Sequence, residues 1–348
     1  MKNILLIGGT LSQTKTMLAV GAELSDHRCY YTPFYCDGHL RRAGERGWLN
    51  FTAMAGPLRD RSLRHLGERG VAIDDRGEGR DYDLVITCTD LIIQRNIRDK
   101  PIVLVQEGLT EPEGLVYLLV KHLGVPRVFA NTAAFGLSDA YAAFCVASEG
   151  AFDLFRRKGV RPEKMVITGI PSFDNARAYL ENDFPHRDFV LVCTSNGRET
   201  FKRDDRRRFL RGAMAIANGR RVIFKLHPGE RHDRATREIR EVAPDALILR
   251  DGNTEHMIAN CSTLVAQYSS VAFTGAALGK EVHSYLDPDE LRRILPLQNG
   301  GTSARRIAGV CREYLDGRPA HLERVRRACA AAAPAFAAPA GELRFIPH

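Results

Sequence analysis

The sequence predicts an α/β protein of two doubly wound domains, each a parallel sheet covered by helices, facing a central cleft. Three observations predict this fold. The chain has 348 residues, which suits two domains of about 150 residues each. Short apolar runs alternate with polar turns and with segments of helical spacing, as in βαβ units. Polar motifs directly follow several apolar runs, where ligands of open α/β sheets bind.

The apolar runs divide the chain into two cycles of strands and helices. We expect a Rossmann-like domain over 1–175, a second Rossmann-like domain over 186–330, and an Ala/Pro-rich tail over 331–348. The polar stretch 181–188 is the expected linker. Helices over 303–315 and 320–331 should close the second domain, and the interval 28–50 receives no assignment. The expected strands are 3–7, 83–87, 102–105, 144–147, 165–168, 189–193, 222–226, 246–249, 263–266 and 281–285.

Composition narrows the class of partner. A formal net charge of +8 favours an anionic partner such as a sugar nucleotide, an acidic glycan or a membrane surface. Nucleic acid is not expected, since no basic stretch interleaved with aromatic residues accompanies the charge. The eight cysteines are scattered, which argues against a CxxC metal or redox site and suits a reducing cytoplasm. The start MKNILLIGG is typical of a first strand and not of a signal peptide, and no apolar run reaches membrane-spanning length.

Two motifs in the second half predict an anion site. His227 and Pro228 end the run VIFKL, and an imidazole at a strand end can hydrogen-bond a phosphate oxygen. Ser269 and Ser270 follow the run LVAQY and precede a helical segment, whose first amides attract anions. The alternatives are a loop-capping histidine and an ordinary serine N-cap.

Glu107 is the candidate general base in the first half. It follows the run IVLVQ and precedes Gly108, so its carboxylate should project from a strand end. Inverting glycosyl transfer needs a base for the attacking hydroxyl and stabilisation of the leaving phosphate opposite it. The alternative is a solvated loop glutamate.

Together, Gln106-Glu107-Gly108, His227-Pro228 and Ser269-Ser270 resemble the three motifs of bacterial sialyltransferases and polysialyltransferases. Similar patterns occur in capsular Kdo transferases and in CDP-glycerol glycerophosphotransferases. The resemblance implies a GT-B fold, Glu107 as base, and the histidine and both serines as ligands of the donor phosphate. One departure is Gln106, which stands where those families have a first acidic residue, so only Glu107 is left to act.

A second resemblance links most of the chain to the non-hydrolysing UDP-N-acetylglucosamine 2-epimerases, which share the GT-B fold. The segment 148–174 is similar to their interdomain crossing, and 83–90 to the strand that delivers a catalytic aspartate, here Asp90. The chain lacks their Gly-Gly-Gln-Glu-Glu segment and has Val271 to Gly275 in its place. This absence makes epimerisation a less favoured activity than glycosyl transfer. Either Glu107 or Asp90 could be the base.

Several further residues are weaker candidates. Gly8, Gly9 and Thr10 form a loop on the acceptor side that gives a ligand close access to the backbone. A P-loop is disfavoured, because Thr14 stands where that motif requires glycine. The remaining donor-side candidates are the phosphate ligands Ser195, Asn196 and Arg198 and the ribose ligand Glu255.

The sequence therefore predicts an inverting, metal-independent glycosyltransferase with no cofactor, since the nucleotide sugar is a substrate. CMP-linked acidic sugars are favoured as donors, and UDP- or CDP-linked donors stay open. The acceptor would be a glycan or a lipid-linked glycan in bacterial surface or secreted polysaccharide biosynthesis. A cytoplasmic location follows, with room for peripheral contact at the inner membrane face. The alternatives are a sugar-nucleotide 2-epimerase and a non-catalytic nucleotide-sugar binding protein.

Overall fold

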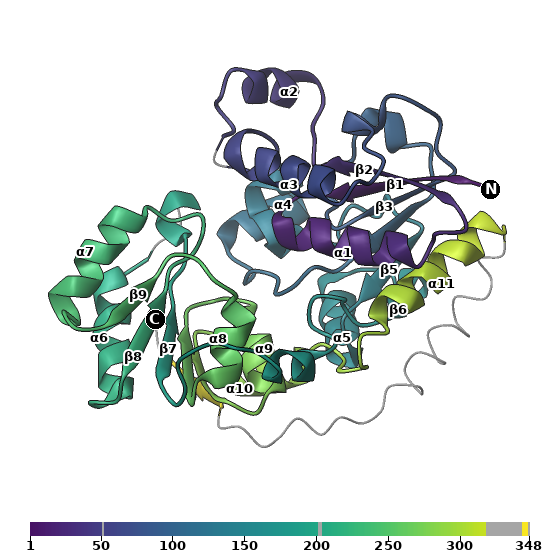
Figure 1. Ribbon diagram of the computed structural model, residues 1–348. Coiled ribbons are helices and arrows are strands. Elements are labelled where there is room, and N and C mark those ends of the chain that lie inside the picture. Colours follow the sequence, from purple (N-terminus) through teal and green to yellow (C-terminus); the bar gives the residue numbers. More distant parts are fainter. Residues whose placement is uncertain (51, 201–203, 318–342, 347–348) are drawn as a thin grey trace. The chain divides into compact units, whose positions relative to one another are not determined.

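The computed structural model describes residues 1–50, 52–200, 204–317 and 343–346 (Figure 1). The chain forms two compact units. Unit 1 comprises Met1–Asp174 and Pro296–Pro334, and unit 2 comprises Asn175–Leu295 and Ala335–His348. Among the described residues, no helix combines the length and the apolar character that crossing a bilayer requires.

Unit 1 is built on a six-stranded parallel sheet with the order β2-β1-β3-β4-β5-β6. Several of these strands are buried along their whole length, which explains their uninterrupted apolar sequences such as IVLV. The strands are β1 (Asn3–Gly8), β2 (Arg28–Pro33), β3 (Leu84–Thr87), β4 (Ile102–Val105), β5 (Ala143–Val146) and β6 (Met165–Ile167).

Helices cover both faces of this sheet. The α-helices are α1 (Leu11–Ala22), α2 (Gly38–Glu45), α3 (Gly56–Glu68), α4 (Leu115–Leu123), α5 (Glu149–Lys158) and α11 (Ser303–Leu315). Short 3-10 helices are η1 (Asp75–Gly77), η2 (Arg95–Ile97), η3 (Arg127–Ala134) and η4 (Pro162–Lys164). Alternate strand residues enter two cores: Leu5 and Ile7 join one, whereas Ile4 and Leu6 join the other.

The division into units differs from the predicted one at α11, which was expected to close the second domain. In the structure α11 lies beside α1 in unit 1 (Figure 1). Its Ile307, Val310 and Cys311 are fully buried in the same core as the α1 residues Met17 and Val20. Chain order suggested the second domain, but the apolar face of α11 is buried in the first.

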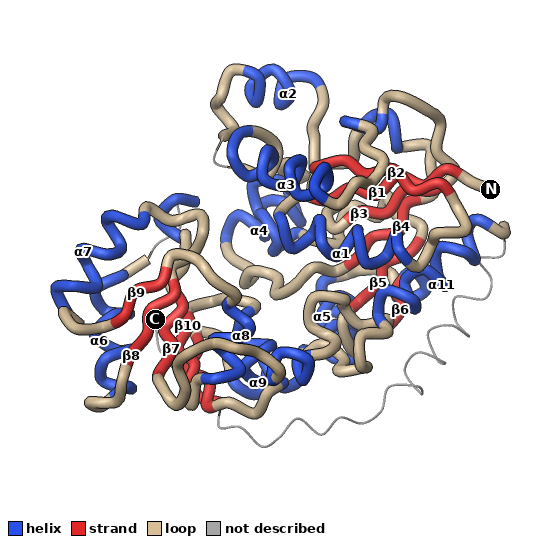
Figure 2. Tube along the Cα trace, in the orientation of Figure 1, coloured by secondary structure: helices blue, strands red, loops and turns tan. Residues whose placement is uncertain are grey.

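Unit 2 is also built on a six-stranded parallel sheet, with the order β12-β11-β10-β7-β8-β9. Figure 2 shows β7, β8, β9 and β10 in red. Read from β9 and renumbered within the unit, the order is 3-2-1-4-5-6, the Rossmann arrangement. The strands are β7 (Val190–Cys193), β8 (Val222–Lys225), β9 (Leu247–Leu249), β10 (Thr263–Ala266), β11 (Glu281–Ser284) and β12 (Leu343–Phe345).

The helices of unit 2 connect these strands. They are α6 (Arg206–Ala217), α7 (His232–Val242), α8 (Thr254–Asn260), α9 (Val271–Ala277) and α10 (Pro288–Ile294), with 3-10 helices η5 (Ala176–Leu180) and η6 (Gly197–Thr200). The expected linker 181–188 belongs to this unit. Its Asn182 accepts a hydrogen bond from the Asn260 amide at 2.6 Å, and Arg187 donates to Asn260 Oδ1 at 2.7 Å. The chain passes from unit 1 to unit 2 earlier, between Asp174 and Asn175.

The expected tail 331–348 contains a strand of the second sheet. β12 pairs in parallel with β11, so that Val282 stands opposite Leu343 and Ser284 opposite Phe345. The difference arises because a three-residue strand is too short to show periodicity in the sequence. The helix expected over 320–331 lies outside the described residues.

Candidate functional site

The candidate donor residues of unit 2 lie at one edge of its sheet. Ser195 follows β7, His227 follows β8, and Ser269 and Ser270 follow β10. These three strands are neighbours, with β7 in the middle, and their carboxyl ends meet at the same edge because they are parallel. The switch point of the doubly wound sheet lies between β7 and β10, where ligands of this fold bind.

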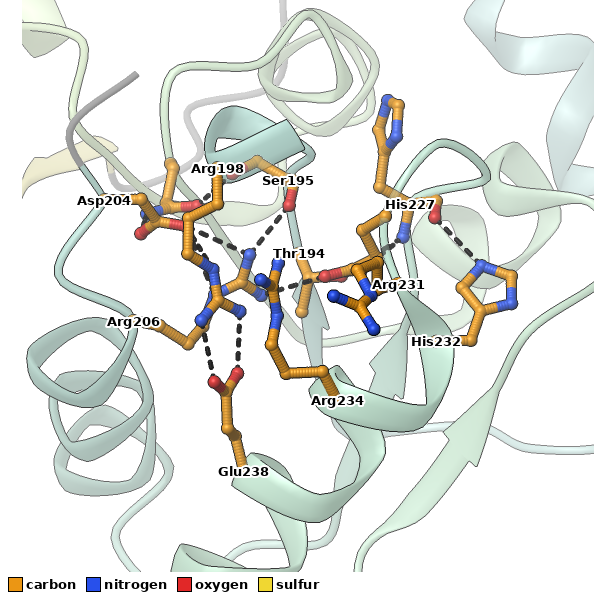
Figure 3. A network of polar contacts seen from close by, with 12 residues as sticks. Thr194, Ser195, Arg198, Asp204, Arg206, His227, Arg231, His232, Arg234 and Glu238 are labelled. Atoms are coloured by element: carbon orange, nitrogen blue, oxygen red, sulfur yellow. Dashed lines mark hydrogen bonds and ion pairs between the residues drawn. The ribbon is translucent and has the colours of Figure 1, made fainter. Parts of the chain in front are cut away.

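The imidazole of His227 is held as a neutral hydrogen-bond donor. Its Nδ1 accepts from the backbone N–H of Gly229 at 3.0 Å, so the ring proton resides on Nε2. Burial, followed by the charge of Lys225, lowers the pKa of His227 to about 4. In Figure 3 the ring points away from the arginines and carboxylates below it. Pro228 is exposed beside it.

A buried polar network connects the ends of these strands (Figure 3). Arg206 donates to Asp204 Oδ2 at 3.1 Å and to the Ser195 carbonyl at 2.7 Å, and it lies 3.3 Å from Glu230 Oε2. Glu230 in turn accepts the backbone N–H of His227 at 2.9 Å. The guanidinium of Arg206 therefore ties the loop after β7 to the loop that carries His227.

The same network reaches the strand β10. Gln267 donates to Asp204 Oδ1 at 2.7 Å and accepts a hydrogen bond from the Ser195 hydroxyl. The sequence did not predict a site role for Asp204, Arg206, Glu230 or Gln267. No signal in the sequence distinguishes Arg206 from the adjacent Arg207 and Arg208, since the partners of Arg206 are brought in by the fold.

The loop after β7 holds its polar side chains in different ways. Arg198 makes two hydrogen bonds of 2.7 Å to the carboxylate of Glu238 on α7, so this guanidinium is engaged within unit 2. A Cβ placed on Gly229 would lie 3.1 Å from Asn196 Nδ2, which puts the Asn196 amide next to the His227 loop. A phosphate contact for Ser195, Asn196 and Arg198 stays a prediction.

The two serines begin the helix α9 without the predicted capping geometry. Ser270 occupies the N-cap position with helical dihedral angles, φ −64° and ψ −13°, and its side chain makes no capping hydrogen bond. Ser269 Oγ accepts from the Val271 N–H at 3.5 Å. Glu255 lies in the first turn of α8, whose amides are capped by Asn253, and its predicted ribose contact is not tested.

Glu107 follows β4 at the corresponding edge of the unit 1 sheet. Its carboxylate accepts a hydrogen bond from Gln13 Nε2 at 3.1 Å. Burial raises the pKa of Glu107, while hydrogen bonds from Gln13, Ser12 and Thr10 act in the opposite direction. The donors around this carboxylate are thus neutral groups at the start of α1. The sequence did not predict a site role for Gln13 or Ser12.

The orientation of Gln13 is fixed by the cap of α1. Gln13 Oε1 accepts the backbone N–H of Thr10 at 3.1 Å, and Thr10 Oγ1 accepts the backbone N–H of Gln13 at 3.3 Å. This capping box directs the amide nitrogen of Gln13 toward Glu107. The Gln13 side chain therefore acts as a positioning group for the candidate base.

Gly8, the last residue of β1, and Gly9 after it make room for the protein's own helix. A Cβ on Gly8 would lie 2.8 Å from Thr14 Oγ1, and a Cβ on Gly9 would lie 2.1 Å from Gln13 Oε1. The close approach predicted for a ligand at Gly8, Gly9 and Thr10 is used, in this structure, by α1 itself. An acceptor contact at this loop stays a prediction.

Gln106 explains why an acid is absent next to Glu107. Its Oε1 accepts the N–H of Ala147 at 2.9 Å, while its Nε2 donates to the carbonyl of Gly108 at 3.1 Å. An amide makes both bonds, whereas an ionised carboxylate could only accept. Gln106 therefore shapes the loop that presents Glu107.

Asp90, the other candidate base, is buried and fully engaged by backbone groups. Its two carboxylate oxygens accept from the N–H groups of Gly136 and Ser138, both at 2.9 Å. Burial raises the pKa of Asp90. These contacts give Asp90 a role in holding the segment 136–138. Within the described ranges, no group of three or more His, Cys, Asp or Glu side chains could hold a metal ion.

No protein-family model and no curated protein matches this chain. Solved structures, however, share its fold. UDP-GlcNAc 2-epimerase from Neisseria meningitidis bound to UDP-GlcNAc is 11% identical, with 94% of this chain and 98% of that chain covered and a TM-score of 0.53. The epimerase from Methanocaldococcus jannaschii is 12% identical, with 90% and 99% covered and a TM-score of 0.52. The wall teichoic acid polymerase TagF is 11% identical, with 95% and 84% covered and a TM-score of 0.48.

The epimerase structures, together with the two parallel sheets, confirm the predicted fold class. The protein is an α/β protein of the GT-B type with two Rossmann-like domains.

Proposed function

We propose that this protein is an inverting, metal-independent glycosyltransferase that uses a nucleotide-activated sugar. Unit 2 binds the nucleotide and its phosphates, and unit 1 supplies Glu107 as the general base. The observation that carries the proposal is Glu107 itself: a carboxylate at a strand end, mostly withdrawn from solvent, oriented by Gln13 and with a raised pKa. A raised pKa makes the carboxylate a stronger base for a hydroxyl acceptor.

Departure of the nucleotide requires hydrogen bonds to the leaving phosphate. The Nε2–H of His227 is a neutral donor at the strand end where such a ligand binds. Ser269 and Ser270 follow the strand on the other side of the switch point. These three side chains form the proposed phosphate-binding set, and Glu255 is the proposed ribose ligand.

The donor class is proposed from the motifs. CMP-linked acidic sugars are favoured because Glu107-Gly108, His227-Pro228 and Ser269-Ser270 resemble the sialyltransferase motifs. UDP-linked donors receive support from the Neisseria meningitidis structure of this fold, which holds UDP-GlcNAc. The proposed setting is bacterial surface or secreted polysaccharide synthesis, with a glycan or lipid-linked acceptor.

A 2-epimerase is the second candidate, favoured by the fold that this chain shares with such enzymes. The contacts of Asp90 weigh against it, because both carboxylate oxygens already accept backbone N–H groups. Asp90→Asn would place an amide NH₂ against a backbone N–H, so we expect a loss of about 1–3 kcal/mol in unfolding free energy. At temperatures where this variant is still folded, an epimerase would lose turnover. A transferase that uses Glu107 as its base would keep its turnover.

A two-stage experiment tests the proposal. Thermal shift with CMP, CDP, UDP, GDP and dTDP identifies the nucleotide, since a ligand of the native state raises the melting temperature. Release of that nucleotide from its sugar donor is then measured for the wild type and for Glu107→Gln. We expect the variant to keep nucleotide binding and to lose turnover about 10³-fold.

Glu113→Gln is the matched control. Glu113 is an exposed carboxylate a few residues further along the same segment, and no change in turnover is expected. Absence of any nucleotide-induced shift, or equal turnover by Glu107→Gln and the wild type, would refute the proposed function.

A further inference from the structure

The helix α4 presents an apolar surface to solvent. Two of its side chains, together with Phe129 of η3, are the most exposed: Leu115 is 81% exposed, Leu123 73% and Phe129 67%. Val116, Leu118 and Leu119 of the same helix are each 44–46% exposed. We call these six residues the α4 patch. Soluble proteins rarely expose so many large apolar side chains together, and such patches mark interaction sites.

The α4 patch reverses the usual arrangement of an amphipathic helix. Only Tyr117 and Val120 of α4 are buried, in a small core formed with Ala130, Ala133 and Ala134. At 100° per residue, the exposed apolar side chains span an arc of about 160° on the side opposite these two. The outward face of α4, normally polar, therefore consists mainly of leucine and valine.

Basic residues accompany the patch. Lys121 and His122 lie in the last turn of α4, both exposed, and Arg127 begins η3. The acidic residues Glu111 and Glu113 lie before the helix, near its first turn. The carboxyl-terminal end of the patch is thus positive, in a chain of net charge +8. Apolar side chains beside cations are the composition of helices that lie in the interface of anionic membranes.

We infer that the α4 patch docks unit 1 onto the surface of an anionic lipid bilayer. A second copy of the chain is a poorer occupant, because a stable protein interface needs roughly 20–30 residues from each side. The patch offers six residues on and beside a nine-residue helix. Shallow insertion into a bilayer requires only apolar side chains on one face and cations near the headgroups.

The position of α4 connects this surface with Glu107. Both follow β4, and α4 begins eight residues after Glu107, at Leu115. If the proposed function holds, on which this step alone rests, docking places the base next to the membrane surface. The acceptor class is then a glycan attached to a lipid.

Flotation of the full-length protein with vesicles tests the docking. The vesicles contain either neutral phosphatidylcholine alone or phosphatidylcholine with a third of phosphatidylglycerol. We expect binding to the anionic vesicles that weakens at high salt. Leu115→Gln with Leu119→Gln should weaken binding about tenfold for each leucine, since glutamine keeps the helix but removes apolar burial. Lys121→Glu should reduce the preference for anionic vesicles.

Leu180→Gln is the matched control, because Leu180 is 53% exposed but belongs to η5 in unit 2. Failure of the wild type to bind anionic vesicles, or equal binding by the Leu115/Leu119 variant, would overturn the inference. A dimer in sedimentation that this variant dissociates would identify the patch as an interface between copies and would also overturn it. Nucleotide-induced thermal shifts of the same samples report on the proposed function separately.

Discussion

The two units use the same edge of the same kind of sheet in opposite ways. In unit 1 the carboxylate of Glu107 lies among neutral donors, and burial raises its pKa. In unit 2 the carboxylates of Asp204, Glu230 and Glu238 face the guanidinium groups of Arg206 and Arg198. The hydrogen bonds from Arg198 lower the pKa of Glu238.

This contrast distinguishes a carboxylate that can act as a base from carboxylates that hold loops in place. A carboxylate paired with arginine stays ionised and fixed, so it can hold loops but is a weak base. A carboxylate surrounded by neutral donors pays a desolvation cost when ionised, which is the condition of a reactive base. Unit 1 therefore has the features of a proton acceptor, and unit 2 those of a rigid frame for an anionic ligand.

The largest effect on stability should come from removing Arg206, which links the buried polar network of unit 2. Arg206→Met removes a buried guanidinium and leaves Asp204 and Glu230 without its charge, which should reduce the unfolding free energy by about 3–5 kcal/mol. Urea denaturation measures this loss. Arg207→Met is the control, since Arg207 is 73% exposed and its ion pair with Glu241 should contribute at most about 1 kcal/mol. Equal losses in both variants would contradict the assignment of Arg206 as the central group.

A substitution of Glu107 should have a smaller effect on stability, and in the opposite direction: it should stabilise the protein. Because its folded pKa is raised, the ionised form is disfavoured in the native state, and stability is lost as pH rises through that pKa. Glu107→Gln lacks this cost and should melt about 1–3 °C higher than the wild type at pH 8, with the difference shrinking toward pH 4. Melting curves across this range measure it. A variant less stable than the wild type at pH 8 would show that Glu107 is a structural anchor like the acids of unit 2.

The smallest effect concerns His227. Because its folded pKa is lowered to about 4, stability linked to this ring is present above pH 6.5 and is lost as pH falls toward 4. Between pH 5.5 and 8 the NMR signals of the ring should therefore not titrate. The resonance is identified by its absence in His227→Gln. A midpoint near 6.5 would mean that His227 meets phosphate as a cation, unlike the neutral donor proposed here.

Much of the fold could be predicted because both sheets are buried on their two faces. Such strands appear as continuous apolar runs, and the runs IVLV and TLVA correspond to β4 and β10 without an error at either end. The secondary structure of the interval 28–50 was harder to predict, because α2 has no buried residue and so shows no apolar periodicity. The place of α11 in unit 1 and of β12 in the sheet of unit 2 depends on long-range packing, which the local sequence pattern does not encode.

Candidate site residues could be predicted only where a reactive side chain comes soon after a strand in the sequence. Glu107 and His227 could be proposed from the sequence because each comes after an apolar run. The hydrogen-bond partners around the site could not be predicted. Gln13 is 94 residues from Glu107 in the chain, and Gln267 is 63 residues from Asp204. Partners so distant in sequence are brought together by the topology, and an isolated glutamine in a sequence carries no mark of such a role.

The interleaving of the two units limits how the gene can be divided. A fragment covering 186–330 would carry α11 away from the core that buries Ile307 and Cys311, and it would lack β12. Without β12, β11 becomes an open strand with unpaired amides, and the bare apolar face of α11 lies in the same fragment. Both are sites where separate molecules adhere to one another, so the isolated piece should aggregate instead of folding alone.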